Sequence, residues 1–293
     1  MSQAQIYQPA VSRVVRKHSI RDLRYVVNEW GNTDKPLLVY LHGWCDTGST
    51  FQFVVDALGE AWHVVAPDWR GFGRTSCPCN SYWFPDYLAD LHALLEIYSP
   101  QEPVRLVGHS MGANVGALYA GTLPARVRAF VNIEGFGLPD SDPGDAPLRY
   151  RLWLEQLALK NGFSTYTDYE ALASRIRKRN PRMSDAAAAF VAREWAREGA
   201  DGVVRLRADP LHKLRNPVLY RRSEAEACWR ATTAEILMLY GTRSEHARRY
   251  GDISTSMYPE ARHSSIADAG HMLHFEAPRE VATAINGFLR STL

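Results

Sequence analysis

A serine at position 110 stands in a Gly-x-Ser-x-Gly pattern that directly follows four strand-like residues, 104–107. Small residues at helical spacing follow it, at positions 113–120. A strand that turns sharply into a helix at a serine exposes the hydroxyl at the end of a sheet, beside a helix N-terminus that favours negative charge. Gly108 and Gly112 are expected there because side chains would collide with the neighbouring strands and helix. The pattern therefore predicts that Ser110 is a nucleophile.

The elements around this serine indicate a parallel sheet. Residues 50–58 and 84–98 carry apolar side chains at helical spacing, between short apolar runs that are typical of buried parallel strands. These runs lie at residues 37–41, 63–67, 104–107, 127–133 and 233–241. Residues 11–20 and 23–30 alternate apolar and polar side chains and predict an antiparallel pair at a sheet edge. The alternation of strands and helices predicts an α/β fold with a mostly parallel, doubly wound sheet.

The alternation stops after residue 137 and resumes near residue 230. Between them we find only helical patterns, at residues 148–159, 166–177 and 185–197. This stretch is longer than any ordinary connection. We predict an all-helical cap over the serine at residues 138–229, inserted after the sixth strand, and a core formed by residues 1–137 and 230–293. An amphipathic helix at 279–293 closes the chain.

Four motifs in this order resemble the alpha/beta-hydrolase fold superfamily, in particular its serine hydrolases with a helical cap. They are Leu41-His42-Gly43-Trp44, the loop from Asp68 to Ser76, Gly108-His109-Ser110-Met111-Gly112, and Asp268-Ala269-Gly270-His271. The resemblance covers nearly the whole chain and implies the fold more specifically than the substrate, since this fold supports many chemistries.

The resemblance implies that His271 is the general base, because it follows the last strand, which is expected at residues 265–267. His42 and His109 flank the site and are expected to hold loops, and His274 is expected to face elsewhere. The oxyanion donors implied are the backbone N–H groups of Met111, the residue after the nucleophile, and of Trp44.

The acidic member of the triad departs from the family pattern. The family places an aspartate three residues after the glycine that ends the seventh strand, and this chain has Ser244 there. Glu245 and Glu134 are the two alternatives. We favour Glu134, because a carboxylate at an apolar strand end is costly to desolvate without a partner, whereas Glu245 sits in a polar string. Asp252 and Asp268 are weaker candidates.

Composition limits the classes of function. The 293-residue chain has a formal net charge of only +2, so no nucleic-acid partner is indicated. No run approaches the roughly 18 apolar residues of a membrane span, and residues 1–10 lack the apolar core of a signal peptide. Four cysteines suggest no disulfide framework, and Cys77 and Cys79 are expected in a turn at the rim of the site. We expect a cytoplasmic monomer or homodimer with a small-molecule substrate and without a metal or organic cofactor.

Together these residues predict a serine hydrolase that cleaves an ester-type acyl bond through an acyl-enzyme, with Ser110, His271 and Glu134 as its triad. Aromatic and aliphatic residues expected near the mouth, among them Phe136 and Leu154, suggest a small or medium apolar substrate. A carbon–carbon bond hydrolase or a thioesterase would use the same triad, and the sequence does not separate them. The alternative from another class is a small-molecule receptor that has the hydrolase fold and little turnover. The absence of the usual triad aspartate is the feature that suggests it.

Overall fold

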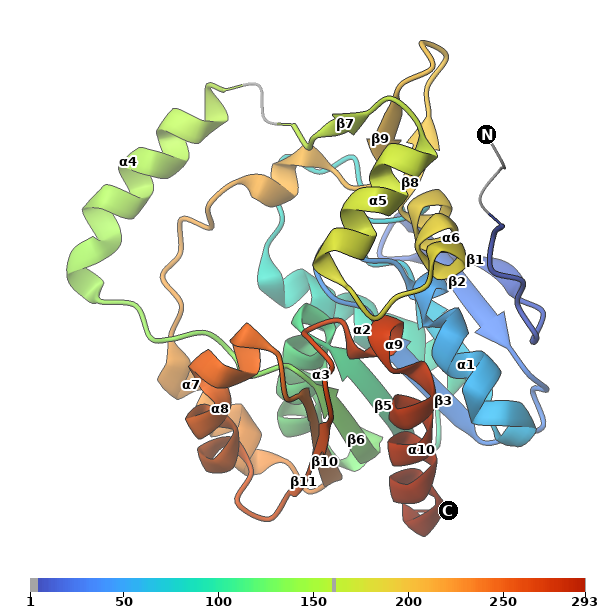
Figure 1. The fold of residues 1–293 in the computed structure, drawn as a ribbon. Coiled ribbons are helices and arrows are strands. Elements are labelled where there is room, and N and C mark those ends of the chain that lie inside the picture. The colour runs from blue at the N-terminus through green and yellow to red at the C-terminus, as the bar shows by residue number, and fades with distance from the viewer. Residues whose placement is uncertain (1–4, 160–161, 293) are drawn as a thin grey trace.

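The computed structural model describes residues 5–159 and 162–292 (Figure 1). Parts of three sequence predictions fall on residues 1–4, 160–161 and 293, and so lie outside the described residues. These are the start of the core, two positions of the predicted cap and the last residue of the closing helix.

The core is an eight-stranded sheet with strand order β1-β2-β4-β3-β5-β6-β10-β11. β1 pairs with β2 and β2 with β4 in antiparallel fashion, and all the other pairs are parallel. The mostly parallel, doubly wound sheet and its antiparallel edge pair are therefore as predicted. The strands are β1 (Val14–Ile20), β2 (Leu23–Trp30), β3 (Leu37–Leu41), β4 (His63–Pro67), β5 (Val104–His109), β6 (Val127–Ile133), β10 (Glu235–Gly241) and β11 (Arg262–Ile266).

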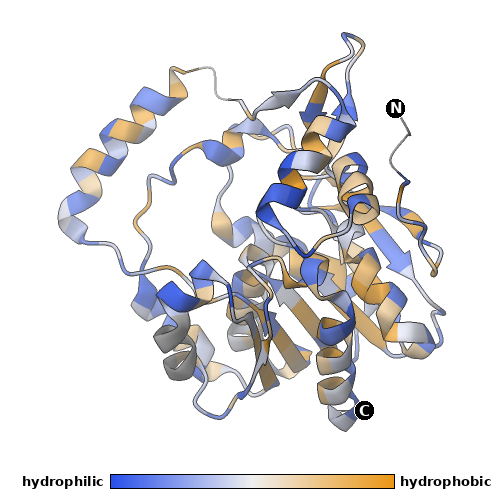
Figure 2. Cartoon of the chain, in the orientation of Figure 1, coloured by the Kyte–Doolittle hydropathy of each residue, from blue (hydrophilic) through white to orange (hydrophobic). Residues whose placement is uncertain are grey.

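Helices cover both faces of the sheet and form a separate hydrophobic cluster on each. One face carries α1 (Gln52–Leu58), α9 (Leu273–Glu276) and α10 (Pro278–Leu289). The other face carries α2 (Phe84–Tyr98), α3 (Met111–Thr122), α7 (Arg222–Ala231) and α8 (Glu245–Met257). Burial on both sides explains why the central strands are mainly apolar and are coloured mostly orange in Figure 2.

The chain reverses its direction of winding between β3 and β5. From β3 it proceeds to β4 on one side, whereas from β5 it proceeds to β6 on the other, although β3 and β5 are neighbours. Open α/β sheets bind ligands in the crevice at the carboxyl ends of such strands. The loop after β3 holds Trp44, and the turn after β5 holds Ser110. The topology therefore brings two of the predicted site segments together.

The segment between β6 and β10 contains the predicted helices, as α4 (Ala146–Leu157), α5 (Tyr169–Arg179) and α6 (Asp185–Trp195). The expectation that it is all-helical is wrong. It also forms an antiparallel sheet of β7 (Thr165–Tyr166), β9 (Val204–Leu206) and β8 (Ala196–Glu198), in that order. Strands of two or three residues are too short to show a period in the sequence. The helix predicted at 185–197 ends at Trp195, where the backbone becomes extended.

Different parts of this segment contact different parts of the core. α5, α6 and β9 share a small hydrophobic cluster with Phe53 of α1 and Phe275 of α9. α7 packs instead against α3, close enough that a Cβ on Gly121 would lie 1.8 Å from the carbonyl oxygen of Cys228. α4 stands apart from the body in Figure 1 and has no buried residue among those described.

Two further observations concern covalent and membrane features. The structure joins Cys77 and Cys79 as a disulfide across a single residue, a local pairing that the sequence analysis did not anticipate. Within the described ranges, no helix has both the length and the apolar character that crossing a membrane requires.

Candidate active site

Ser110 lies on the turn between β5 and α3 in a strained conformation, with φ +50° and ψ −113°. Its N–H donates to the carbonyl of Ile133 at 2.8 Å, which holds the turn against β6. The flanking glycines are required sterically. A Cβ on Gly108 would lie 2.6 Å from the Cα of Ala113, and one on Gly112 would lie 2.1 Å from a carbonyl oxygen of β3. The local sequence therefore builds the sharp turn that exposes a serine side chain.

His271 and Glu134 are brought together although they are 137 positions apart in the chain. The Nδ1–H of His271 donates to Oε2 of Glu134 at 3.2 Å. Glu134 follows β6 at φ +58° and is fully buried, whereas the His271 side chain is about one third exposed. A carboxylate on Nδ1 fixes the imidazole tautomer and leaves Nε2 able to accept a proton.

Ser244 occupies the position where the family pattern has its aspartate, and it contacts the same carboxylate. Its hydroxyl donates to Oε2 of Glu134 at 2.7 Å and accepts from the N–H of Ala247 at 3.1 Å, which caps α8. The N–H of Gly241 donates to Oε1 of Glu134 at 2.9 Å. These neutral donors satisfy a charge that burial would otherwise penalise. In the sequence Ser244 is only a departure from the family pattern, but its spacing of three residues from Gly241 is the signal that indicates this contact.

The other carboxylates considered for the triad lie elsewhere. Glu245 is the first residue of α8 and is exposed. Asp268 is also exposed, with its N–H bonded to the Thr242 hydroxyl at 2.9 Å. The side chain of Asp252 lies outside the part of the chain whose side chains are described.

The two expected oxyanion donors lie on the loops that meet at the sheet's reversal point. Met111 is the first residue of α3, so its N–H is one of the donors that a helix leaves without an intrahelical partner. Trp44 follows Gly43, where an added Cβ would lie 3.3 Å from the Cβ of Ser110. The Trp44 loop is thus packed beside the serine, and its indole is about half exposed.

The histidine next to Ser110 holds the His271 loop. Nε2–H of His109 donates to the backbone carbonyl of His271 at 2.9 Å, and the two ring centroids are 4.8 Å apart. Burial lowers the pKa of His109 well below its ordinary value, and the neighbouring histidines lower it further, so this ring is neutral. His42 holds the loop after β4, since its Nε2 accepts from the N–H of Trp69 at 2.8 Å.

His274 is fully buried, and its side chain contacts the loop after β3; among the described contacts it has no hydrogen bond to Ser110 or His271. Its Nε2 lies 3.1 Å from Oδ2 of Asp46, on the loop that follows β3. Oδ1 of Asp46 accepts from the Thr50 hydroxyl and from the Trp195 indole N–H, each at 2.7 Å. This carboxylate therefore joins the Trp44 loop, the His271 segment and α6. No periodic pattern in the sequence indicates these contacts of Asp46.

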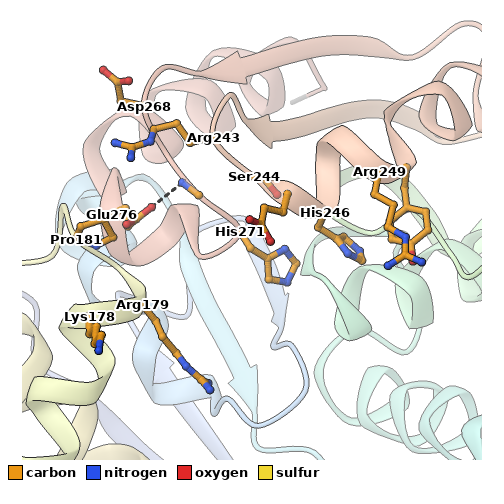
Figure 3. Close-up of a pocket in the computed structure, with 13 residues that line it drawn as sticks. Lys178, Arg179, Pro181, Arg243, Ser244, His246, Arg249, Asp268, His271 and Glu276 are labelled. Carbon is orange, nitrogen blue, oxygen red and sulfur yellow. Dashed lines mark hydrogen bonds between the residues drawn. The ribbon is translucent and has the colours of Figure 1, made fainter.

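A cleft of about 670 Å³ opens beside His271. Its walls are the end of α5, the first two turns of α8 with the loop before it, and the segment from Asp268 to Glu276 (Figure 3). These walls are mainly polar. Phe136, expected near the mouth, is buried against the His246 ring, and Leu154 lies exposed on α4.

Comparison with known proteins identifies the fold family. A family model described as the alpha/beta hydrolase fold matches residues 36–278. The chain belongs to this family. The match runs from the start of β3 into α10, and it includes the Ser110 turn, Glu134 and His271.

Several relatives are named as hydrolases, and others as a decarboxylase or a probable oxidoreductase. The chain is 25% identical to a serine hydrolase-like protein of Danio rerio, over 89% of this chain and 83% of that one. It is 24% identical to a 2-(acetamidomethylene)succinate hydrolase of Mesorhizobium japonicum, over 87% and 88%. A thioesterase domain from the curacin biosynthetic pathway has the same fold, with TM-score 0.84 and 24% identity over 94% of this chain and 99% of that one. Family and relatives together support a hydrolase.

Proposed function

We propose that the protein is a serine hydrolase that cleaves an ester-type acyl bond through an acyl-enzyme. Oγ of Ser110 attacks the carbonyl carbon while Nε2 of His271 takes the hydroxyl proton. The N–H groups of Met111 and Trp44 stabilise the oxyanion that forms. The intermediate expels the alcohol, which leaves with the proton from His271. Water, deprotonated by the same ring, then releases the acid and restores Ser110.

The observation that carries this proposal is the buried contact between Glu134 and His271. A carboxylate without solvent exposure that accepts from Nδ1, and is itself held by two neutral donors, is the orienting partner that a general base requires. This contact supports a hydrolase over a small-molecule receptor, because Glu134 supplies the carboxylate that is absent at position 244. We also propose that α4 to α6 and β7 to β9 form the cap over this site.

Active-site labelling and turnover test the proposal. A fluorophosphonate probe should label the wild-type protein stoichiometrically and should not label Ser110→Ala. A panel of 4-nitrophenyl esters and matched thioesters of graded chain length then identifies the bond and the acyl size. Absence of labelling together with absence of turnover across the panel would show that the serine is not activated, and the proposal would be wrong.

A further inference from the structure

The cleft beside His271 carries positive side chains for which the proposed reaction gives no role. Lys178 and Arg179 line it from the last turn of α5, and Arg243 and Arg249 line it from the loop before α8 and from α8 itself. All four are exposed. Figure 3 shows Arg179 extending from α5 toward the open space in front of His271, with Arg249 beyond His246 on the opposite wall. Figure 2 colours α5 largely blue.

These cationic side chains differ from their neighbours in lacking an acidic partner. On the same helix, Arg177 is paired with Asp185, and Arg182 just beyond it is paired with Glu280. No carboxylate among the described side chains forms an ion pair with Arg179 or Arg249. Arg249 lies over the Tyr250 ring, with its guanidinium carbon 5.5 Å from the ring centroid. Neither guanidinium group is therefore neutralised by an ion pair with a described carboxylate.

Three acidic residues also line the cleft, and they offset this charge only in part. The Glu276 carboxylate is engaged, since its Oε2 accepts from the N–H of Gly270 at 2.6 Å and the residue is buried. Asp268 points away from the cleft in Figure 3. Glu245 remains, at the N-terminus of α8, where the helix dipole already stabilises its charge.

His246 adds no positive charge near neutral pH. Its ring centroid lies 5.0 Å from that of His271. Burial lowers the pKa of His246, and the nearby His271 and Arg249 lower it further, so the ring is neutral at pH 7. The guanidinium groups thus set the sign of the potential in front of the proposed base.

We propose that the substrate carries a carboxylate or phosphate group, which Arg179 and Arg249 bind on the two sides of the proposed base. This inference rests on the proposed hydrolase function and narrows its substrate class. Guanidinium groups bind such oxyanions through paired, charge-assisted hydrogen bonds, and an unpaired arginine loses no internal partner when it does so. The group belongs either to the acyl part, as in the monoester of a dicarboxylic acid, or to the leaving group, as in coenzyme A.

Two matched pairs of substrates test the proposal and distinguish the sources. 4-Nitrophenyl butyrate and mono-4-nitrophenyl succinate differ by a carboxylate on the acyl part. S-butyryl-N-acetylcysteamine and butyryl-coenzyme A differ by the phosphates of the leaving group. We expect kcat/KM to be at least about tenfold higher for the anionic member of one pair. That preference should shrink between 50 and 500 mM NaCl, because exposed charges are screened.

Arginine variants test whether the preference for anionic substrates depends on Arg179 and Arg249. Arg179→Gln and Arg249→Gln should each lower kcat/KM for the preferred anionic substrate about tenfold and leave its neutral counterpart unchanged. Arg177→Gln is the matched control, since this residue shares α5 but pairs with Asp185 outside the cleft. Glu245→Gln should raise the anionic preference. If the wild type treats both pairs alike, or if the variants affect neutral and anionic substrates equally, there is no anion site here.

A binding measurement separates this proposal from the function on which it rests. Isothermal titration calorimetry of Ser110→Ala with succinate and with coenzyme A measures anion binding in the absence of turnover. Binding that Arg179→Gln weakens, in a protein that turns over no ester and takes no probe, would support the anion site and refute the hydrolase. Turnover of both neutral substrates without anion binding would support the hydrolase and refute the anion site.

Discussion

Replacing Glu134 by glutamine tests the role assigned to the buried carboxylate. Glu134 accepts three hydrogen bonds, from the Gly241 N–H, the Ser244 hydroxyl and Nδ1–H of His271. A glutamine has only one oxygen. If that oxygen faces His271, its NH₂ group opposes the Gly241 N–H at 2.9 Å and leaves a buried donor unpaired, which costs about 1–3 kcal/mol.

The amide therefore turns its NH₂ toward His271, and the Ser244 hydroxyl rotates to accept from it. The imidazole must then present a lone pair at Nδ1 and carry its proton on Nε2, which is the wrong tautomer for accepting the serine proton. The comparable change in a serine protease triad lowers kcat about 10⁴-fold. We expect a loss of the same order here, equivalent to about 5 kcal/mol of barrier.

Steady-state hydrolysis of the neutral ester 4-nitrophenyl butyrate measures this loss, and thermal unfolding verifies that the variant is folded. Glu245→Gln is the matched control, because Glu245 is exposed and has no hydrogen bond to His271 among the described contacts. It should change ester turnover by less than about threefold. Near-normal turnover in a folded Glu134→Gln protein, or a larger loss in Glu245→Gln, would refute the assignment.

Three further results are expected. Ser244→Ala removes a donor to the carboxylate and the N-cap of α8, so urea titration should show about 1–2 kcal/mol less stability, with turnover reduced roughly tenfold. Because burial lowers the pKa of His109, the unfolded chain binds a proton below about pH 6.5 that the folded chain excludes. Stability should fall by up to about 1.4 kcal/mol per pH unit below that value, and a slope that His109→Gln leaves unchanged would contradict this. Trp195→Phe removes the indole donor to Asp46 and should cost about 1 kcal/mol and speed proteolysis between β6 and α7; an unaltered cleavage rate would count against that tie.

The core of the fold could be predicted from the sequence because its strands are buried on both faces. Short, mainly apolar runs mark β3, β4 and β5, and the glycines around Ser110 are needed for steric reasons that hold wherever such a turn occurs. Glu134 could also be predicted from the cost of burial, since a carboxylate at the end of an apolar strand needs a hydrogen-bond partner.

The sequence could not reveal contacts made by short or distant segments. β7, β8 and β9 have two or three residues each, too few for a period, so the segment read as helical only. The burial of His274 depends on Asp46, 228 positions away, and no local pattern encodes that pairing. The cleft is likewise lined by residues of α5, of α8 and of the segment from Asp268 to Glu276, which are far apart in the sequence.

Asp46 connects the core to the insertion between β6 and β10, so the two parts of this candidate enzyme are not independent of each other. One carboxylate receives hydrogen bonds from Trp195 in the insertion and from Thr50 in the core, and it lies against His274 in the segment that carries His271. If the insertion were exchanged for that of a relative, Oδ1 of Asp46 would lose the hydrogen bond from the Trp195 indole. The new insertion would have to supply another N–H donor at the same place. Exchanging specificity between relatives thus requires matching one hydrogen bond as well as the shape of the pocket.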